Sequence, residues 1–443
     1  MQNFGKNLPK MAKPSNGGVL DMSEKDRRTG MLLCCIIGWA LAAIMFIVAI
    51  YAIATRPSIR RSLAVARSER AKVSDRVAAI CSIGALRDAK SVPELIELLK
   101  GGDATIRASA TMALVAVGEP AVPELANIIK AAQQIPIIST ADMLPMGTPE
   151  SAAAYALTGI GKEALPELMK MLQSKEHKVW YSAAQIISRI GRDALPVLTK
   201  AFTETNDTGF SYNIATTIGL MGDVAEGALI ETYKATSDQA KRIQLLSQFG
   251  SIKNPSKDAL ELLFKAAEEP TTAPTALSAL GQTRHPEAIR FLIGKLRSED
   301  PAIRNNAAVA LGIAGAKEAV PQLIELLKDE KAASGAANAL GALRDMRALN
   351  PLIELLRKKT DASMHAAYAL GSLGAKEAVP ALIATLKELK GSKEHITLKI
   401  ACIIALGQLR ATEAKPVLEE MLNDPDQMVR DNAKRVLDQL SQW

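Results

Sequence analysis

The chain has 443 residues, of which 48% are hydrophobic and only 4% aromatic, and its formal net charge is +7. This length is sufficient for a large core, and no alternating strand pattern is evident, so we expect an all-α protein. The charge is uneven: residues 1–30 carry +3 and residues 55–76 carry +5, which leaves −1 for residues 77–443. Because nucleic-acid-binding proteins concentrate basic residues on their folded body, we expect no nucleic-acid partner.

The first 55 residues differ in composition from the rest. Residues 1–30 are polar and contain scattered charges, which predicts a disordered tail. Residues 31–55 contain no charged residue, and about 20 apolar helical residues suffice to cross a bilayer core of about 30 Å. We therefore predict a transmembrane helix from Met31 to Thr55, an uncleaved signal anchor in a plasma or inner membrane. The alternative is a buried core helix, although such helices are seldom apolar on every face.

The basic residues that flank this segment bear on its orientation. Within twenty residues of its ends, four Lys or Arg residues precede it and six follow it. The positive-inside rule therefore favours a cytoplasmic location for the rest of the chain. The opposite orientation stays open, because a charged tail of this length is more often kept inside. Residues 56–76 are predicted to form a basic joint that either contacts anionic headgroups and caps the first repeat, or is a solvated linker.

From about residue 73 the chain repeats itself. GAKEAVP at 315–321 recurs at 374–380, and PELIELL at 93–99 recurs as NPLIELL at 350–356. Each unit is typical of an Ala-rich helix, a glycine turn and a second helix that proline begins. Two helices in about 30 residues indicate an α-solenoid, and we predict eleven units. With Pro321 as the reference, the equivalent positions are Pro93, Pro123, Pro166, Pro196, Gly227, Lys257, Arg290, Asn350, Pro380 and Pro416.

The unit at residues 300–327 shows the pattern most completely. Its first helix carries Asp300, Pro301, Arg304, Ala307, Ala308 and Ala310–Gly312, and its second carries Ala319–Pro321 and Leu323–Leu327. These residues resemble the HEAT-like repeat of the PBS-lyase type, over about Val73 to Gln442. The resemblance implies a solenoid of stacked helix pairs, here residues 77–443, and no single function, since such repeats serve enzymes and scaffolds alike. It also implies that the recurring basic residues of the first helices, Arg107, Arg304 and Arg430, bridge neighbouring units.

Two parts of the solenoid depart from the regular pattern. Between Pro123 and Pro166 the spacing is 13 residues longer than a normal repeat, and residues 131–150 hold the excess. An apolar insertion at one edge of a solenoid is a candidate docking site, and the alternative is that it folds back over its own groove. Its candidate partner-binding residues are Ile135, Ile137, Ile138, Met143, Leu144 and Met146. The last segment, 424–443, contains only a first helix and is typical of a terminal cap.

Catalytic patterns are missing from the sequence. The HEAT-type hydroxylases bind two irons through His-Glu pairs, whereas His177, His285, His365 and His395 are followed by other residues. The four cysteines have no metal-binding spacing, and neither a phosphate-binding loop nor a nucleophile elbow is present. We therefore predict no catalytic residue, no metal and no cofactor.

The function that we predict is that of a membrane-anchored HEAT-repeat scaffold which binds a protein or peptide. The second helices would line a concave surface, where carboxylates recur at Glu94, Glu97, Glu124, Glu167, Glu325 and Glu354. The alternative is an enzyme or enzyme subunit of the phycobilin-lyase or metal-hydroxylase type. A third possibility is a spacer, because eleven stacked units make a long body.

Overall fold

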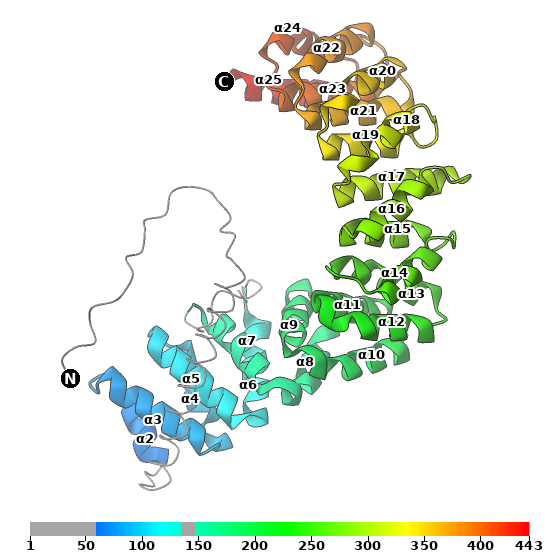
Figure 1. Cartoon of the computed structure of the whole chain (residues 1–443). Helices are drawn as coiled ribbons and strands as arrows, with labels where there is room; N and C mark the ends of the chain where they lie inside the picture. The colour runs from blue at the N-terminus through cyan, green and yellow to red at the C-terminus, as the bar shows by residue number, and fades with distance from the viewer. Residues whose placement is uncertain (1–58, 134–146, 443) are drawn as a thin grey trace, which may run out of the picture. The chain divides into compact units, whose positions relative to one another are not determined.

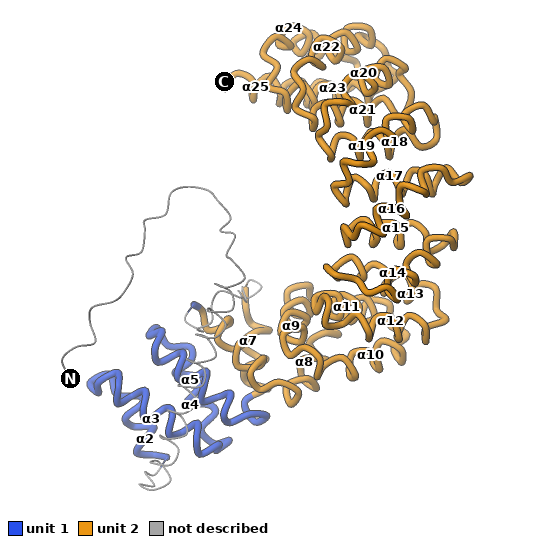
Figure 2. The backbone as a smooth tube through the Cα atoms, viewed as in Figure 1, with its two compact units in different colours: residues 1–121, 144–147 blue, residues 122–143, 148–443 orange. Residues whose placement is uncertain are grey.

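The computed structural model describes residues 59–133 and 147–442. These residues belong to two compact units, which Figure 2 shows in different colours. Unit 1 holds residues 59–121 and 147, and unit 2 holds residues 122–133 and 148–442. Within these ranges all regular secondary structure is helical, so the prediction of an all-α protein is confirmed.

The predicted membrane segment, residues 31–55, lies outside the described residues, as does the tail before it. In the ranges 59–133 and 147–442 no helix is both long enough and apolar enough to cross a bilayer. The longest one, α25 (Gln427–Ser441), has 15 residues and hence a length of about 22 Å, whereas a bilayer core is about 30 Å thick. The prediction of a membrane location is corrected accordingly, and membrane attachment is not part of the function proposed below.

Unit 1 begins with a short helix inside the predicted basic joint. Helix α2 (Ile59–Arg67) packs on α3 (Val73–Ala85) and buries Ser62 and Ala66. The guanidinium of Arg76 donates a hydrogen bond to the carbonyl of Ala66 at 2.9 Å, which ties α3 to the end of α2. The unit continues with α4 (Val92–Lys100) and α5 (Ala104–Val117), and α5 packs on both α3 and α4.

Unit 2 continues the alternation of first and second helices to the end of the described chain. The described residues contain eleven helix pairs, from α3 and α4 to α23 and α24, as predicted. Helix α25 follows them as a single terminal helix, which was also predicted. The helices of unit 2 are α6 (Val122–Ala131), α7 (Pro149–Ile160), α8 (Leu165–Leu172), α9 (His177–Ile190), α10 (Leu195–Glu204), α11 (Thr208–Leu220), α12 (Glu226–Ala235), α13 (Gln239–Gln248), α14 (Lys257–Ala266), α15 (Ala273–Thr283), α16 (Pro286–Lys295), α17 (Pro301–Ala314), α18 (Val320–Leu326), α19 (Ala333–Leu343), α20 (Leu349–Arg357), α21 (Asp361–Leu373), α22 (Val379–Glu388), α23 (Ile396–Gln408), α24 (Lys415–Met421) and α25.

Within unit 2 the helices form two layers. The first helices α15, α17, α19, α21, α23 and α25 each pack on the next one along the chain, and so do the second helices α20, α22 and α24 (Figure 1). Each second helix also packs on the first helix that follows it, as α18 does on α19 and α22 on α23. Short apolar side chains permit this stacking, and the buried core consists mainly of alanine and leucine. The predicted solenoid is confirmed.

Local signals in the sequence set the ends of the helices. Aspartate side chains accept hydrogen bonds from the first backbone N–H groups of several first helices, as Asp103, Asp300 and Asp426 do. Proline occupies the first turn of many second helices, where its missing N–H is not needed, as in α18 with Pro321. These two signals alternate along the chain, and the alternation produces the helix pair.

The two glycines near the end of α17 have different roles. Gly315 ends the helix with a φ of +74°, a conformation that glycine adopts without strain. Gly312 is helical, but a Cβ atom at this position would lie 2.8 Å from the Cα of Ala339 in the next first helix. Gly312 therefore allows two first helices to approach closely, while Gly315 lets the chain reverse.

The repeat register is correct over most of the chain and differs at two helices, α14 and α16. Helix α14 begins at Lys257, so Asp258 occupies the register position, one residue later than predicted. Pro321, Gly227 and Asn350 are each the second residue of their helices, as predicted. Helix α16 begins at Pro286, so Glu287 occupies the register position and not Arg290. The reason is that no short 3-10 turn separates α15 from α16, so this second helix begins a few residues earlier than the period predicts.

A pair of glycine substitutions tests the close approach of first helices. Gly341→Ala should destabilise the protein by about 1–3 kcal/mol, because the new Cβ would lie 2.8 Å from the Cα of Ala369. Gly294→Ala in α16 is the control: no atom lies within 4 Å of its Cβ, so it should stabilise the helix by about 0.5–1 kcal/mol. Urea unfolding measures both changes, and equal effects at the two sites would contradict this packing.

Candidate interaction surfaces

The carboxylates predicted to line a binding surface all lie on second helices. Glu94 and Glu97 are on α4 in unit 1, and Glu124, Glu325 and Glu354 are on α6, α18 and α20 in unit 2. Four of them are exposed, and Glu94 is half-buried. Their placement on one kind of helix follows the repeat period. Whether they bind a partner stays a prediction.

Several of these carboxylates already have basic neighbours. Glu97 pairs with Lys100 at 3.1 Å and Glu325 with Lys328 at 2.8 Å, both one helical turn apart. Such exposed pairs contribute about 0.2–1 kcal/mol each. These two lysines therefore neutralise two of the recurring carboxylates, and a charged partner would have to compete with them.

One ion-pair cluster joins two second helices. Lys130 on α6 lies 2.7 Å from Glu167 on α8, and Lys170 lies 3.2 Å from the same carboxylate. The hydrogen bond from Lys130 lowers the pKa of Glu167 below its ordinary value. Glu167 belongs to the same recurring set of glutamates, and its ion pair with Lys130 links two neighbouring repeats.

The apolar candidates of the insertion cannot be placed. Ile135, Ile137, Ile138, Met143, Leu144 and Met146 all lie outside the described residues. Their role in binding stays a prediction.

A basic residue recurs at the fourth position of the first helices and holds the loops between repeats. The guanidinium of Arg304 donates to the carboxylate of Asp329 at 2.7 Å and to the carbonyl of Ser298 at 2.7 Å. Ser298 lies in the loop before α17, and Asp329 lies in the loop before α19, so this side chain joins two consecutive loops. We call this arrangement the loop clamp. The fourth-position basic residues are Arg76, Arg107, Arg242, Arg304, Lys399 and Arg430.

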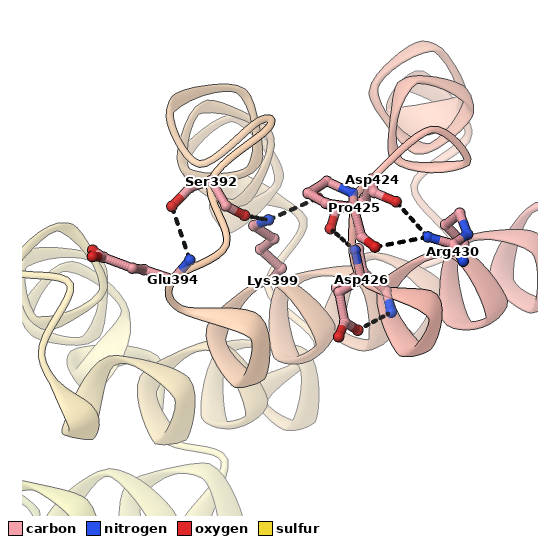
Figure 3. Close-up of polar contacts among 8 residues, drawn as sticks. Ser392, Glu394, Lys399, Asp424, Pro425, Asp426 and Arg430 are labelled. Atoms are coloured by element: carbon pink, nitrogen blue, oxygen red, sulfur yellow. Dashed lines mark hydrogen bonds and ion pairs between the residues drawn. The ribbon is translucent and has the colours of Figure 1, made fainter.

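The most deeply buried clamp is near the C-terminus (Figure 3). The side chains of Lys399 and Asp424 are fully buried, and their charged atoms lie 2.7 Å apart. Lys399 also donates to the carbonyl of Ser392, while Arg430 donates to the carbonyl of Asp424 at 2.7 Å. The charged groups of Lys399, Asp424 and Arg430 each have a partner in this cluster, so we assign it to the stability of the last repeat. Sequence reasoning found Arg107, Arg304 and Arg430 but missed Lys399, because lysine breaks the arginine pattern.

In the central repeats, the fourth-position residue Arg242 lies beside a cavity. Arg242 on α13 donates to the hydroxyl of Tyr233 at 2.7 Å and lies 3.5 Å from the carboxylate of Glu269. The cavity has a volume of about 670 Å³ and is lined by residues of α12, α13 and α14 and by Glu269 in the loop after α14. Its lining includes three basic and three acidic side chains, of which Arg242 and Glu269 pair with each other. Such a balanced lining favours no particular ligand charge.

The histidines do not converge. His285 caps α16 by accepting a hydrogen bond from the N–H of Glu287, and His365 lies 3.0 Å from the side-chain oxygen of Asn338. His177 and His395 lie at the starts of α9 and α23. In the described part of the chain, no three His, Cys, Asp or Glu side chains are grouped as a metal site would require. Burial raises the pKa of both described thiols, Cys81 and Cys402, which makes them poor nucleophiles.

Sequence reasoning missed an aromatic cluster on two neighbouring first helices. His177, Trp180 and Tyr181 of α9 contact one another, and Tyr212 of α11 contacts Trp180 with ring centroids 6.2 Å apart. We call these four residues the aromatic platform. The signal for it was present, because Tyr181 and Tyr212 are 31 residues apart, which is one repeat period.

The geometry of paired helices in a two-layer stack agrees with the family comparisons. A HEAT-repeat model matches residues 268–334, and the PBS lyase HEAT-like repeat matches residues 75–101, 332–358, 364–388 and 398–424. A further HEAT-repeat model matches residues 415–443. HEAT repeats are detected in the chain. The matched residues include repeats near both ends of the solenoid. Over these residues the resemblance to HEAT-like repeats that the sequence showed is confirmed.

Solved structures similar to this chain include Kap121p and importin beta. Kap121p has 12% sequence identity and a TM-score of 0.45, with 87% of this chain and 49% of Kap121p covered. Importin beta has 13% identity and a TM-score of 0.41, with coverages of 86% and 62%. The chain thus spans about half the length of Kap121p, and similarities at this level carry no functional argument. No curated protein matches the chain.

Substitutions in the buried clamp test its structural role. Asp424→Asn should destabilise the protein by about 3–5 kcal/mol, because it leaves the buried ammonium of Lys399 without its counter-charge. The double variant Lys399→Met/Asp424→Leu should recover much of this loss, since it removes both charges. Denaturant unfolding measures both, and a double variant no more stable than the single one would show that the clamp does more than neutralise charge.

The lowered pKa of Glu167 predicts a dependence of stability on pH. A carboxylate whose folded-state pKa is depressed stabilises the protein above its unfolded pKa of about 4.3, and this contribution disappears as the pH falls through the folded pKa. Glu167→Gln should therefore lower the melting temperature at pH 7 and change it little at pH 3. The exposed Glu124→Gln on α6 is the control. A stability loss for Glu167→Gln that is the same at both pH values would contradict the ion pair.

Proposed function

We propose that the chain is a HEAT-repeat scaffold that binds a protein or peptide partner and has no catalytic centre of its own. The observation that carries this proposal is the repetition of one helix pair along the described chain. Repetition places equivalent side chains in rows on each layer of helices, so the exposed positions form extended surfaces. An extended surface suits a polypeptide, whereas an active site needs unlike groups that converge on one point.

The charge of the solenoid supports a protein partner over a nucleic acid. Residues 77–443 carry a net charge of −1, and binding to phosphates requires a surplus of basic residues. The carboxylates at Glu97, Glu124, Glu325 and Glu354 and the apolar insertion residues 135–146 remain candidate contacts within this proposal. An enzyme subunit of the lyase or hydroxylase type is the alternative, and it would need a convergent site.

A selection from random peptide libraries tests the proposal with the full chain as bait. We expect peptides that bind the folded chain saturably and lose binding when the chain is unfolded. The double variant Glu325→Lys/Glu354→Lys should change their affinity by at most about thirtyfold if these exposed charges lie at the rim of the contact, since such charges contribute about 0.2–1 kcal/mol each.

Two results would contradict the scaffold proposal. One is a failure to recover any peptide or protein that binds the folded chain. The other is stoichiometric iron in the purified protein together with turnover of a substrate, which would favour the hydroxylase alternative. Metal analysis of the same preparation distinguishes these cases.

A further inference from the structure

The two helix layers of unit 2 differ in charge. The first helices α11, α15 and α19 contain no charged residue, whereas the second helices α12, α14 and α16 contain three or more each. Where basic residues occur at the fourth position of first helices, as in α13 and α17, they pair with carboxylates in the loops. The first helices α11, α15 and α19 are thus uncharged, while α9 carries Lys178 and Arg189. The recurring glutamates lie on the other layer, that of the second helices.

The aromatic platform lies in the first-helix layer, on α9 and on the uncharged helix α11. The side chain of Tyr212 is 52% exposed, His177 is exposed, and Trp180 and Tyr181 are half-buried. These residues are unusual in the chain, which contains only three tryptophans and six tyrosines. Charge depletion together with exposed tyrosine and tryptophan is typical of the centre of a protein interface.

The rings of the platform are held at fixed angles to one another. The rings of His177 and Tyr181 are stacked, with centroids 5.4 Å apart and an interplanar angle of 12°. The ring of Trp180 stands nearly perpendicular to that of Tyr181, at 89°, and to that of Tyr212, at 78°. Trp180 therefore contacts both the stacked pair on α9 and the tyrosine on α11, so the four rings form one continuous aromatic cluster.

Two of the charges next to the platform pair with each other. Glu176 and Lys178, which flank His177 in the sequence, lie 3.8 Å apart. A charged residue of a partner would lose its hydration on the platform without gaining a counter-ion, which costs free energy. The side chains of Trp180, Tyr181 and Tyr212 provide an indole N–H and two phenol O–H groups, which are hydrogen-bond donors. The occupant should accordingly be uncharged and rich in hydrogen-bond acceptors.

On these grounds we propose that the aromatic platform binds a proline-rich segment of a partner protein in the polyproline II conformation. Such a segment is uncharged, its backbone carbonyls are free to accept hydrogen bonds, and its rings pack against aromatic side chains. The inference rests on the proposed scaffold function and names the class of partner. It moves the principal contact from the glutamates of the second helices to the first helices α9 and α11.

Tryptophan fluorescence tests this inference directly. In the full chain with Trp39→Phe and Trp443→Phe, Trp180 is the sole tryptophan and reports on the platform. Titration with an uncharged proline-rich peptide of about ten residues should shift the emission saturably. Peptides of equal length rich in lysine or in glutamate, without proline, should not do so.

Matched tyrosine variants locate the contact. Tyr212→Ala should weaken peptide binding about tenfold or more, as expected for an aromatic residue at the centre of an interface. Tyr368→Ala on α21, a first-helix tyrosine outside the platform, should leave the affinity unchanged. Thermal melting of each variant checks that it folds. If Tyr212→Ala does not fold, Tyr181→Ser provides a second platform variant.

The possible outcomes separate this inference from the scaffold proposal. If library-selected peptides bind but the proline-rich peptide does not, or if its binding is unaffected by Tyr212→Ala, the platform inference fails and the scaffold remains. If neither kind of peptide binds, both fail. An emission shift that depends on protein concentration without any peptide would show that a second copy of the chain occupies the platform, and would also overturn the inference.

Discussion

The close packing of successive first helices is the constraint on which the rest of the solenoid depends. A Cβ atom at Gly312 or Gly341 would lie 2.8 Å from the Cα of an alanine in the next first helix, so the backbones there almost touch. Only a glycine, facing an alanine of the next first helix, permits this distance. The alanines of the first helices are accordingly buried, and little of each first helix is left to carry polar groups.

This packing accounts for the separation of charge between the layers. A first helix is enclosed by the first helices before and after it and by second helices, so a charged side chain there must find a partner or remain in a narrow exposed strip. Arg304 and Lys399 satisfy this requirement by binding loop carbonyls and a carboxylate. The second helices are more exposed and carry lysine and glutamate, which pair along their own helix or, as Lys130 and Glu167 do, across two helices. The two layers therefore offer a partner different chemistry.

The central repeats keep the stacked helix pairs although their loop contacts and turns differ from those of the other repeats. Arg242 keeps the fourth position of the clamp, but it binds the hydroxyl of Tyr233, and a cavity opens beside it. Helix α16 follows α15 without the usual 3-10 turn, which displaces its first residue relative to the period. These changes lie in the units where proline is missing from the register position. They indicate that local turn chemistry can change while the stacking of helices persists.

The sequence by itself determined the helix pairs, their number and most of their boundaries, because capping aspartates, proline and glycine act within a few residues of their own position. It also placed Glu94, Glu97, Glu124, Glu325 and Glu354 on second helices, since their recurrence follows the period. Only the tertiary structure decided that several of these carboxylates pair with lysine or arginine, and that Lys399 is equivalent to Arg304. It alone brought Trp180 and Tyr212 into contact. The physical reason is that contacts between repeats depend on how helices about 30 residues apart are stacked, which no local pattern specifies.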